Sequence, residues 1–243
     1  MPSAVSRLLL APIIALFCTL SAGNAVAGES AIRVAVAANF RAPLDIINRE
    51  FESQTGIRLR VSSASTGVLA NQVAHGAPFD IFLAADRVRP VQLHAEKFAT
   101  LAPPFCYARG SLVLAGARNG LADLADASSS LAIGNPDTAP YGAAAMQVLA
   151  RPEFATGNSR KLVRGTSVLQ AYQFWASGNV DLALLPRSLA PEGAIAIPTD
   201  WHDPVDQYAL ALNNSAPVVR YLQWLKSDRV RNLITDAGYE PCH

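Results

Sequence analysis

The chain has 243 residues, with 20 lysines and arginines against 19 aspartates and glutamates, so its net charge at pH 7 is +1. This length suits one large domain or two small ones. The balanced charge lacks the basic face that nucleic-acid binding requires, and we expect no nucleic-acid partner. Beyond the N-terminal segment, no apolar stretch is long and uncharged enough to cross a membrane.

The first 27 residues have the layout of a cleavable signal peptide. Arg7 precedes an apolar run of thirteen residues, LLLAPIIALFCTL, which is shorter than the roughly 20 residues that span a bilayer. Ala25, Val26 and Ala27 follow in an A-x-A arrangement, which predicts cleavage after Ala27. A buried N-terminal helix fits less well, because small residues and a new strand pattern come next. We therefore expect an exported, periplasmic protein.

The rest of the chain alternates short apolar runs with segments of helical period, which is typical of α/β folds with mainly parallel sheets. In its first part, one helix is predicted to end at Gly56 and a shorter one to run from about Val68 to Gly76. Asp86 is placed to cap the helix that follows. The predicted strands between these helices cover 32–38, 57–63 and 79–85.

The second part of the chain repeats this alternation. Pro140 suits the first turn of a helix over 141–150, and Ser167 precedes a helix that ends at Gly178. The last helix is predicted to end at Gly238. Strands are predicted at 111–116, 131–134, 180–186 and 206–212.

Two cysteines, Cys106 and Cys242, remain after the predicted cleavage. In an oxidising compartment an even pair predicts a disulfide. Two free thiols are the alternative, because the sequence does not give the Cα separation that a bridge requires.

Motifs for catalysis or metal binding are missing from the sequence. It contains no G-x-S-x-G elbow, Walker loop, H-E-x-x-H or C-x-x-C. The acidic residues form no conspicuous pair, and the histidines show no ligand spacing. We therefore predict no enzymatic activity, no bare metal ion and no cofactor. The histidines are His75, His94, His202 and His243.

Four junctions between a predicted strand and a predicted helix are rich in small and polar residues. In open α/β sheets, ligands bind beyond the carboxyl ends of the strands. Helix N-termini there offer unpaired N–H groups and a positive dipole, which favour an anion. Any one junction alone fits ordinary helix capping as well. The junctions are AANF (37–40), SASTGV (63–68), NPDTAPYG (135–142) and GTSVL (165–169).

These junctions supply side-chain donors without positive charge. Lysine and arginine are absent inside them, although Arg41 and Arg164 flank two. The pattern therefore predicts a cleft that holds an anion or a polar ligand by neutral dipoles. The side-chain donors are the Asn39 amide, the Ser65, Thr66 and Ser167 hydroxyls and the Tyr141 phenol.

At the same residues the sequence resembles the periplasmic molybdate-binding protein family, over essentially the whole mature chain. The resemblance is carried by AVAANF (35–40), SSASTGVLANQVAHGAPFDIFLAAD (62–86), LAIGNPDTAPYGAAAMQVL (131–149) and GTSVLQAYQFWASGNVDLALL (165–185). It implies an α/β fold of the type II periplasmic binding protein kind, in which two α/β lobes with mainly parallel sheets are joined by two crossing strands.

The resemblance also implies a division of the chain. It places the crossing strands at 110–116 and 206–212. Lobe one then comprises 28–109 plus 211–243, lobe two comprises 110–210, and the ligand cleft lies between them.

Carried over by motif, the resemblance assigns ligand residues to both lobes. Lobe one contributes the loop that contains Ala38 and Asn39, together with Thr66 and Ser65. Lobe two contributes Tyr141 and the backbone N–H of Val168. Many members have serine at the positions of Asn39 and Thr66, and the asparagine and threonine of this chain both keep a side-chain donor there. Some members also use a tyrosine where this chain has Pro186.

In function, the resemblance implies a monomeric binding protein that captures molybdate, and tungstate with it, and passes the oxyanion to the membrane permease of an ABC transporter. A binder of sulfate or another tetrahedral oxyanion is the alternative within this class. From other classes, the alternatives are an effector-sensing domain and an exported hydrolase that uses Ser167 or Ser65. The signal peptide and the missing DNA-binding segment disfavour the first, and the missing base disfavours the second.

Overall fold

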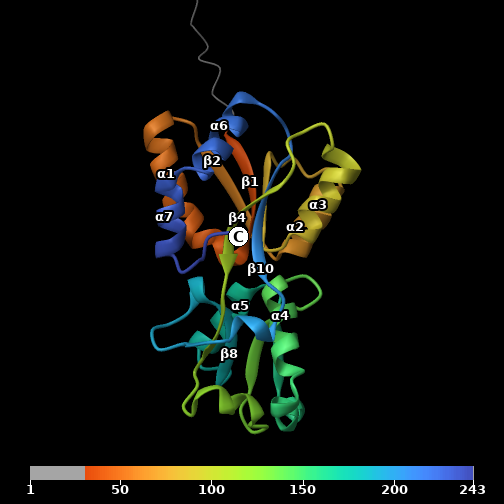
Figure 1. Cartoon of the computed structure of the whole chain (residues 1–243), viewed down its shortest axis with the longest axis vertical. Coiled ribbons are helices and arrows are strands. Elements are labelled where there is room, and N and C mark those ends of the chain that lie inside the picture. Colours follow the sequence, from red (N-terminus) through yellow and green to blue (C-terminus); the bar gives the residue numbers. More distant parts are fainter. Residues whose placement is uncertain (1–30, 243) are drawn as a thin grey trace, which may run out of the picture.

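The computed structural model describes residues 31–242, so the predicted signal peptide and His243 lie outside the described residues. The chain folds into two lobes, each built on a five-stranded sheet that carries helices (Figure 1). Lobe one is the upper lobe in Figure 1 and holds both ends of the described chain. Lobe two is formed by the middle of the sequence. Within 31–242 no helix has the length and apolar character to cross a membrane.

The sheet of lobe one has the strand order β2-β1-β3-β10-β4. Its first three strands are parallel, and β10 runs antiparallel to both of its neighbours, β3 and β4. The buried strands carry apolar side chains on both faces, as expected where helices cover a sheet on both sides. The strands are β1 (Ile32–Ala37), β2 (Leu59–Ala64), β3 (Ile81–Ala84), β4 (Phe105–Gly110) and β10 (Val205–Ala211).

The helices of lobe one pack on this sheet through apolar stripes. In α1, Leu44, Ile47 and Phe51 recur at helical spacing and are buried, and Gly56 ends the helix as predicted, with φ of +74°. The Asp86 carboxylate accepts a hydrogen bond from the Arg89 N–H at the start of α3, which is the predicted capping role. The helices are α1 (Arg41–Thr55), α2 (Thr66–Ala74), α3 (Val88–Leu93), α6 (Ala216–Leu225) and α7 (Asp228–Asp236), and a 3₁₀ turn, η1 (Ala38–Phe40), precedes α1.

The sheet of lobe two has the equivalent order, β7-β6-β8-β5-β9. Strands β7, β6 and β8 are parallel, and β5 runs antiparallel to β8 and β9. Helix α4 begins at Pro140, as predicted. The elements are β5 (Leu112–Ala115), β6 (Leu131–Gly134), α4 (Pro140–Leu149), β7 (Leu162–Gly165), α5 (Val168–Ala176), β8 (Leu182–Pro186), the 3₁₀ turn η5 (Arg187–Leu189) and β9 (Ile195–Ala196).

The chain passes between the lobes twice. The first passage is short, because β4 ends at Gly110 in one sheet and β5 begins at Leu112 in the other. The second passage leads into β10, which β3 and β4 between them pair along its whole length. By hydrogen bonding, 205–210 therefore belong to the sheet of lobe one, whereas the predicted division, which named 206–212 as a crossing strand, counted residues up to 210 with lobe two. An apolar strand suits either sheet, so its pattern does not reveal its partners.

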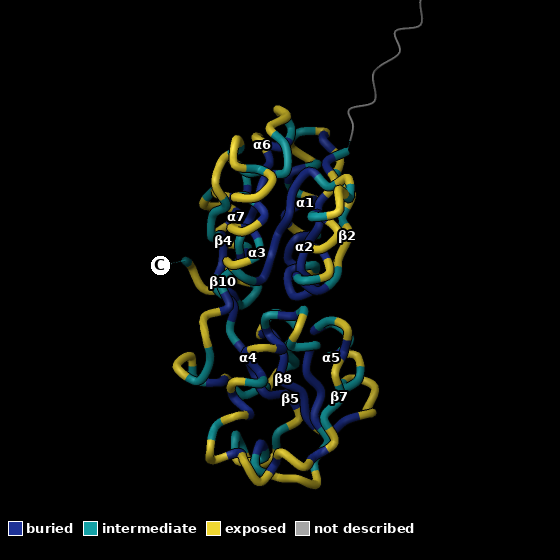
Figure 2. Tube along the Cα trace, turned by 90° about the vertical axis from the view of Figure 1, so that its right-hand side faces the viewer, coloured by how far each residue is buried: buried dark blue, intermediate teal, exposed yellow. Residues whose placement is uncertain are grey.

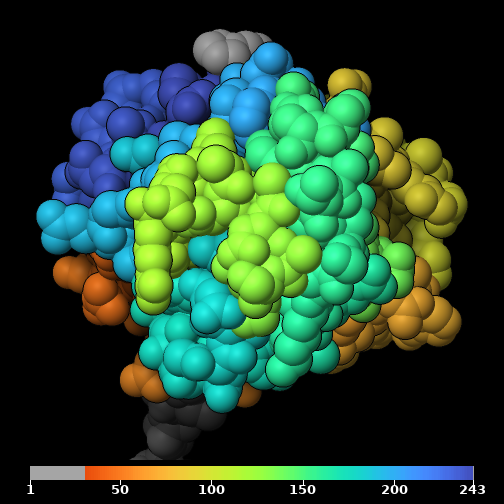
Figure 3. All heavy atoms as spheres, turned by 90° about the horizontal axis from the view of Figure 1, so that it is seen from below, coloured from red at the N-terminus to blue at the C-terminus, as the bar shows by residue number. Residues whose placement is uncertain are grey.

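Each lobe has its own apolar core. The buried strands form the dark interior of both lobes in Figure 2. Seen from the far end of lobe two, the front of the molecule consists of segments from the middle of the sequence, coloured yellow-green to teal (Figure 3). The site residues thus sit where two separately built lobes meet.

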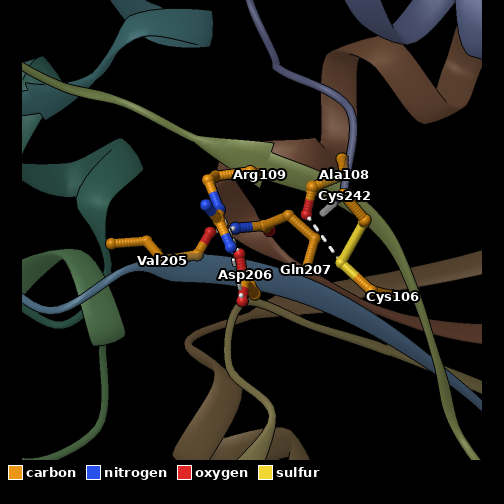
Figure 4. Close-up of a disulfide and its surroundings, with 7 residues drawn as sticks. All are labelled: Cys106, Ala108, Arg109, Val205, Asp206, Gln207 and Cys242. Atoms are coloured by element: carbon orange, nitrogen blue, oxygen red, sulfur yellow. Dashed lines mark hydrogen bonds and ion pairs between the residues drawn. A yellow bond between two sulfur atoms is a disulfide. The ribbon is translucent and has the colours of Figure 1, made fainter. Parts of the chain in front are cut away.

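A disulfide joins Cys106 in β4 to Cys242, with 6.1 Å between the two Cα atoms (Figure 4). Both residues belong to lobe one. The bridge closes a loop over a sequence separation of 136 residues, and a link of this kind typically stabilises a fold by about 2–4 kcal/mol. It also fixes a C-terminal segment that would otherwise fray.

Candidate ligand-binding site

One cavity between the lobes brings together all six residues that the sequence nominated as ligands. About 190 Å³ of its space is not filled by atoms. Lobe one and lobe two line opposite sides of it, so closure of the lobes encloses whatever it holds. The lining residues are Ala37, Ala38, Asn39, Ser65, Thr66, Ala139, Pro140, Tyr141 and Val168.

Four helix starts converge on this cavity. Ala38 begins η1, which continues into α1; Thr66 begins α2; Pro140 begins α4; and Val168 begins α5. The first N–H groups of a helix have no acceptor within the helix, and the dipole is positive at that end. Four such ends around one small space produce a site suited to an anion.

Ser65 occupies the N-cap position of α2, yet its side chain does not cap the helix. Its buried hydroxyl has no hydrogen-bond partner within residues 31–242. Ser167, at the N-cap of α5, behaves differently, because its hydroxyl accepts a hydrogen bond from the Gln170 N–H at 3.4 Å and is not among the atoms lining the cavity. Ordinary capping therefore explains Ser167 but not Ser65.

Thr66 has one contact that fixes the direction of its hydroxyl. The Ala85 N–H donates to Thr66 Oγ1 at 3.0 Å, so the oxygen is used as an acceptor and the hydroxyl proton remains to be donated. The side chain is 1% exposed and lines the cavity. Thr66 is therefore a donor held in place by the neighbouring strand end.

Tyr141 enters the cavity from lobe two with a buried phenol. Its hydroxyl has no hydrogen-bond partner in the described part of the chain. Burial, then the nearby Tyr239 and Tyr107, raises the pKa of Tyr141 well above its ordinary value, and the Tyr239 hydroxyl lies close enough to interact with it although not in full hydrogen-bond geometry. The phenol therefore stays a donor at physiological pH. A Cβ at Gly110 would lie 1.7 Å from the Tyr141 hydroxyl, which means that glycine at the first crossing makes room for it.

The Asn39 amide was expected to donate to the ligand, but its protons are used within lobe one. Val205 C=O accepts from Gln207 Nε2 at 2.9 Å, so Gln207 Oε1 must face Asn39. Asn39 Nδ2 donates to this oxygen at 2.8 Å and to the Tyr239 hydroxyl at 2.9 Å. Both amide protons are therefore committed inside lobe one, and the donor left for a ligand is the backbone N–H in the first turn of η1.

Neutral groups alone line the cavity, as far as the described residues show. Arg41, which flanks the first junction, is occupied by Asp45 at 3.0 Å and by the Val61 carbonyl. Arg164 lies in β7 beside a different cavity. Pro186 ends β8, where it pairs with Leu112, and does not line the site. Within 31–242, no group of three or more His, Cys, Asp or Glu side chains could hold a metal ion.

The lobes touch each other directly around the cavity. The Gly67 N–H in α2 donates to the Thr138 carbonyl of lobe two at 2.8 Å. Arg89, paired with Asp86, donates to the Asp137 carbonyl at 3.1 Å. These bonds close the rim on the side of α2 and α3, so the arrangement is that of lobes closed over the site.

Sequence reasoning missed three residues that support the site: Gln207, Ser188 and Tyr239. Ser188 Oγ donates to the Asn39 carbonyl at 2.9 Å, and Tyr239 also donates to this carbonyl at 2.8 Å. Gln207 lies within β10 and Tyr239 follows α7, so neither stands in a strand–helix junction, which was the signal that predicted the ligand residues; Ser188 follows β8 in η5, a junction that was not singled out. Nothing in the C-terminal sequence indicated that Tyr239 reaches the first ligand loop.

Comparison with known proteins agrees with this architecture. Residues 32–240 match the family described as bacterial extracellular solute-binding protein. The molybdate-binding protein ModA of Azotobacter vinelandii is 38% identical over 243 aligned positions, covering 93% of this chain and 96% of that protein. ModA of Rhodobacter capsulatus is 35% identical and covers 88% and 89%, respectively.

A solved structure supports the same relationship. The A. vinelandii periplasmic molybdate-binding protein matches with a TM-score of 0.80 at 32% identity, covering 87% of this chain and 100% of that chain. The sulfate-binding protein SubI of Mycobacterium tuberculosis, at 15% identity and a TM-score of 0.68, shares the fold. The two lobes, their crossing strands and these relatives show that the chain belongs to the bacterial extracellular solute-binding proteins, in the family of the molybdate-binding proteins, and is a binding protein rather than an enzyme.

Proposed function

We propose that this protein captures molybdate, and tungstate with it, outside the cytoplasm and delivers the oxyanion to the membrane permease of an ABC importer. The relatives named for molybdate binding cover nearly the whole chain. The ligand residues we assign are Ala38, Asn39, Ser65, Thr66, Tyr141 and Val168, all of which line one cavity. Residues 1–27 serve as the signal peptide that brings the protein to the periplasm.

The observation that carries this proposal is a pair of buried, unpaired hydroxyls facing one cavity from opposite lobes. Ser65 Oγ and the Tyr141 hydroxyl both lack partners among the described residues. Leaving a polar group buried and unpaired costs about 1–3 kcal/mol, so a site built this way gains when a ligand supplies acceptors. A fully deprotonated tetrahedral oxyanion presents acceptors in every direction.

Neutral donors are sufficient for tight binding. A hydrogen bond to a charged group contributes about 1.5–3 kcal/mol, and micromolar affinity corresponds to about −8 kcal/mol. The hydroxyls of Ser65, Thr66 and Tyr141 and the first-turn N–H groups of Asn39 and Val168 together contribute about 7.5–15 kcal/mol, a range that reaches this figure. The cost of ordering the lobes around the ligand is subtracted from that sum.

The donors also determine selectivity. Phosphate near neutral pH carries a proton, which a lining of donors does not accept. Sulfate has no proton but is smaller, so fixed donors spaced for molybdate would leave some of themselves unpaired around it. We therefore expect molybdate and tungstate to bind with similar affinity, and sulfate and phosphate far more weakly.

Native mass spectrometry of protein purified from molybdate-supplemented cells tests the proposal. We expect a bound mass equal to one MoO4 and a protein mass that corresponds to a chain beginning at Gly28. Calorimetry with molybdate, tungstate, sulfate and phosphate in one buffer then ranks the anions. Sulfate binding as tight as molybdate binding would overturn the molybdate assignment and favour the alternative, a sulfate binder. No bound anion in either measurement would overturn anion capture itself.

A further inference from the structure

We infer that Tyr239 is a positioning residue for the anion site: its hydroxyl holds the Asn39 loop in binding geometry and ties that loop to lobe two through Ser188. This inference rests on the proposed function and adds a group, far away in sequence, that does not line the cavity. Tyr239 acts through Asn39, and we expect it to govern both affinity and the lifetime of the closed, liganded form.

The C-terminal segment that carries Tyr239 is anchored on the edge of lobe one. Arg109 in β4 and Glu240 exchange backbone hydrogen bonds, 2.8 Å in each direction, and form an antiparallel bridge. Two residues further on, Cys242 is bound to Cys106 of the same strand. The Arg109 side chain turns instead to Asp206 at 2.6 Å, on β10 beside Gln207 (Figure 4). These attachments fix the backbone on the C-terminal side of Tyr239.

From this anchored segment the phenol reaches the first ligand loop. The Tyr239 hydroxyl accepts from Asn39 Nδ2 at 2.9 Å and donates to the Asn39 carbonyl at 2.8 Å. One side chain therefore engages both the amide and the backbone of the same residue. Burial raises the pKa of Tyr239 above its ordinary range, even though interactions with Ser188, Asn39 and the Tyr141 hydroxyl lower it, so the hydroxyl keeps its proton.

Ser188 extends this network across the lobe boundary. It lies in η5 of lobe two, and its hydroxyl contacts the Asn39 carbonyl at 2.9 Å and the Tyr239 hydroxyl at 3.0 Å. The Ser188 and Tyr239 hydroxyls have one proton each, so they donate at most two of the three hydrogen bonds that they form with each other and with the Asn39 carbonyl. These contacts cross the boundary between the closed lobes, so we expect the network to link the orientation of the Asn39 loop to closure.

Loss of the Tyr239 hydroxyl would release the loop without disturbing the packing of the ring. Asn39 Nδ2 would lose one acceptor and its carbonyl one donor, and both are buried. The first turn of η1 would then relax, and its backbone N–H groups would no longer be held toward the cavity. Supporting partners of ligand residues in metal sites are typically worth about 10- to 100-fold in affinity, and we expect a loss of this size here.

A matched control stands next to Tyr239. Phe40 is flanked by two tyrosine rings in edge-to-face contact, Tyr107 with 4.9 Å between centroids and Tyr239 with 5.3 Å. The Tyr107 hydroxyl is buried without a hydrogen-bond partner in residues 31–242. Tyr107→Phe and Tyr239→Phe therefore remove the same atom from the same aromatic cluster, but only the second removes contacts to Asn39.

The experiment measures molybdate binding to the mature, disulfide-bonded protein, three single variants and one double variant. We expect Tyr239→Phe to bind about 10- to 100-fold more weakly and Tyr107→Phe to match the wild type within about twofold. Ser188→Ala should speed the exchange of bound molybdate for isotopically enriched molybdate. Combined with Tyr239→Phe, it should add less than its separate effect, because the two residues share one network.

Hydrogen exchange of the ligand-free proteins separates this inference from the proposed function. Tyr239→Phe should speed exchange of the amides at 38–42, and Tyr107→Phe should not, whatever the ligand is. If the wild type binds no molybdate, the proposed function fails while this readout still decides the inference. Wild-type affinity and wild-type exchange in Tyr239→Phe, or equal losses in Tyr107→Phe, would overturn the positioning role.

Discussion

The two sides of the cavity are built in different ways. On the side of lobe one, two ligand residues are braced by polar contacts: Thr66 accepts from the Ala85 N–H, and Asn39 is held by Gln207 and Tyr239, whereas the Ser65 hydroxyl is unpaired within 31–242. On the side of lobe two, the Tyr141 hydroxyl has no partner among the described residues. Each side also presents helix N-termini, so the difference lies in the side chains.

This difference predicts different roles for the two lobes in binding. Because Thr66 and Asn39 are already held in place, we expect an anion that meets them to lose little entropy in ordering them. We expect the Tyr141 phenol to gain its partner only when the lobes close on the ligand. On this hypothesis lobe one presents a largely prepared half-site, and lobe two completes it. Changes on the two sides should therefore separate affinity from stability.

The largest effect should come from Thr66→Val, which removes a braced hydroxyl of lobe one. The isosteric change removes a donor to the anion and leaves the buried Ala85 N–H without its acceptor. We expect molybdate affinity to fall by about 1.5–3 kcal/mol and the unfolding free energy of the ligand-free protein to fall by about 1–3 kcal/mol. Calorimetry measures the first, and denaturant unfolding the second.

Ser65→Ala is the control for this change within the same lobe. It removes a hydroxyl that has no partner in 31–242, so affinity should fall and stability should not. A Thr66→Val variant as stable as the wild type would show that the contact with Ala85 does not brace the site, and would remove the difference between the two sides.

Tyr141→Phe should have an intermediate effect, confined to binding. The substitution keeps the ring and its packing but removes one charge-assisted hydrogen bond to the ligand. We expect a loss of about 1.5–3 kcal/mol, or roughly 10- to 150-fold in affinity. The ligand-free melting temperature should not fall, because the hydroxyl it loses is unpaired. Calorimetry and thermal unfolding of the same preparation measure both quantities.

Unchanged molybdate affinity in Tyr141→Phe would assign Tyr141 to packing beside Pro140 and leave lobe one and Val168 to hold the anion. A drop in melting temperature without a drop in affinity would lead to the same conclusion. Either result would contradict the account of lobe two as the side that completes the site.

The sequence predicted the residues that line the cavity better than the groups around them. Ser65, Thr66, Tyr141 and Val168 stand at junctions where a strand ends and a helix begins, so a local pattern was enough to predict that they would lie together. Gln207, Ser188 and Tyr239 are separated from Asn39 by 168, 149 and 200 positions. Their contacts arise from the tertiary fold, which no local pattern encodes.

The fold shows the same limit. Helix ends such as Gly56 and helix starts such as Pro140 were predicted, because the backbone preferences of glycine and proline act locally. Strands β4, β7 and the two-residue β9 were missed. In β4 the six residues FCYARG mix apolar, charged and small side chains, and their strand conformation depends on pairing with β10. The allocation of β10 to lobe one was likewise decided by its partners.

The smallest expected effect is that of pH on binding, and it tests both sides of the cavity together. Tyr141 is the titratable side chain among the described residues that line the site. Burial, then the nearby Tyr239 and Tyr107, raises its pKa well above the ordinary value. The phenol therefore keeps its proton, and its donor capacity, through the neutral range, and deprotonation would place a negative charge against the anion only in strong alkali.

Molybdate affinity should accordingly stay constant from about pH 6 to about pH 9. The binding enthalpy should also be independent of the ionisation enthalpy of the buffer, because no proton is taken up or released. Calorimetry in buffers of different ionisation enthalpy measures both. An affinity that changes tenfold per pH unit within this range would show that a titrating group contacts the anion, and a site of neutral donors would no longer describe it.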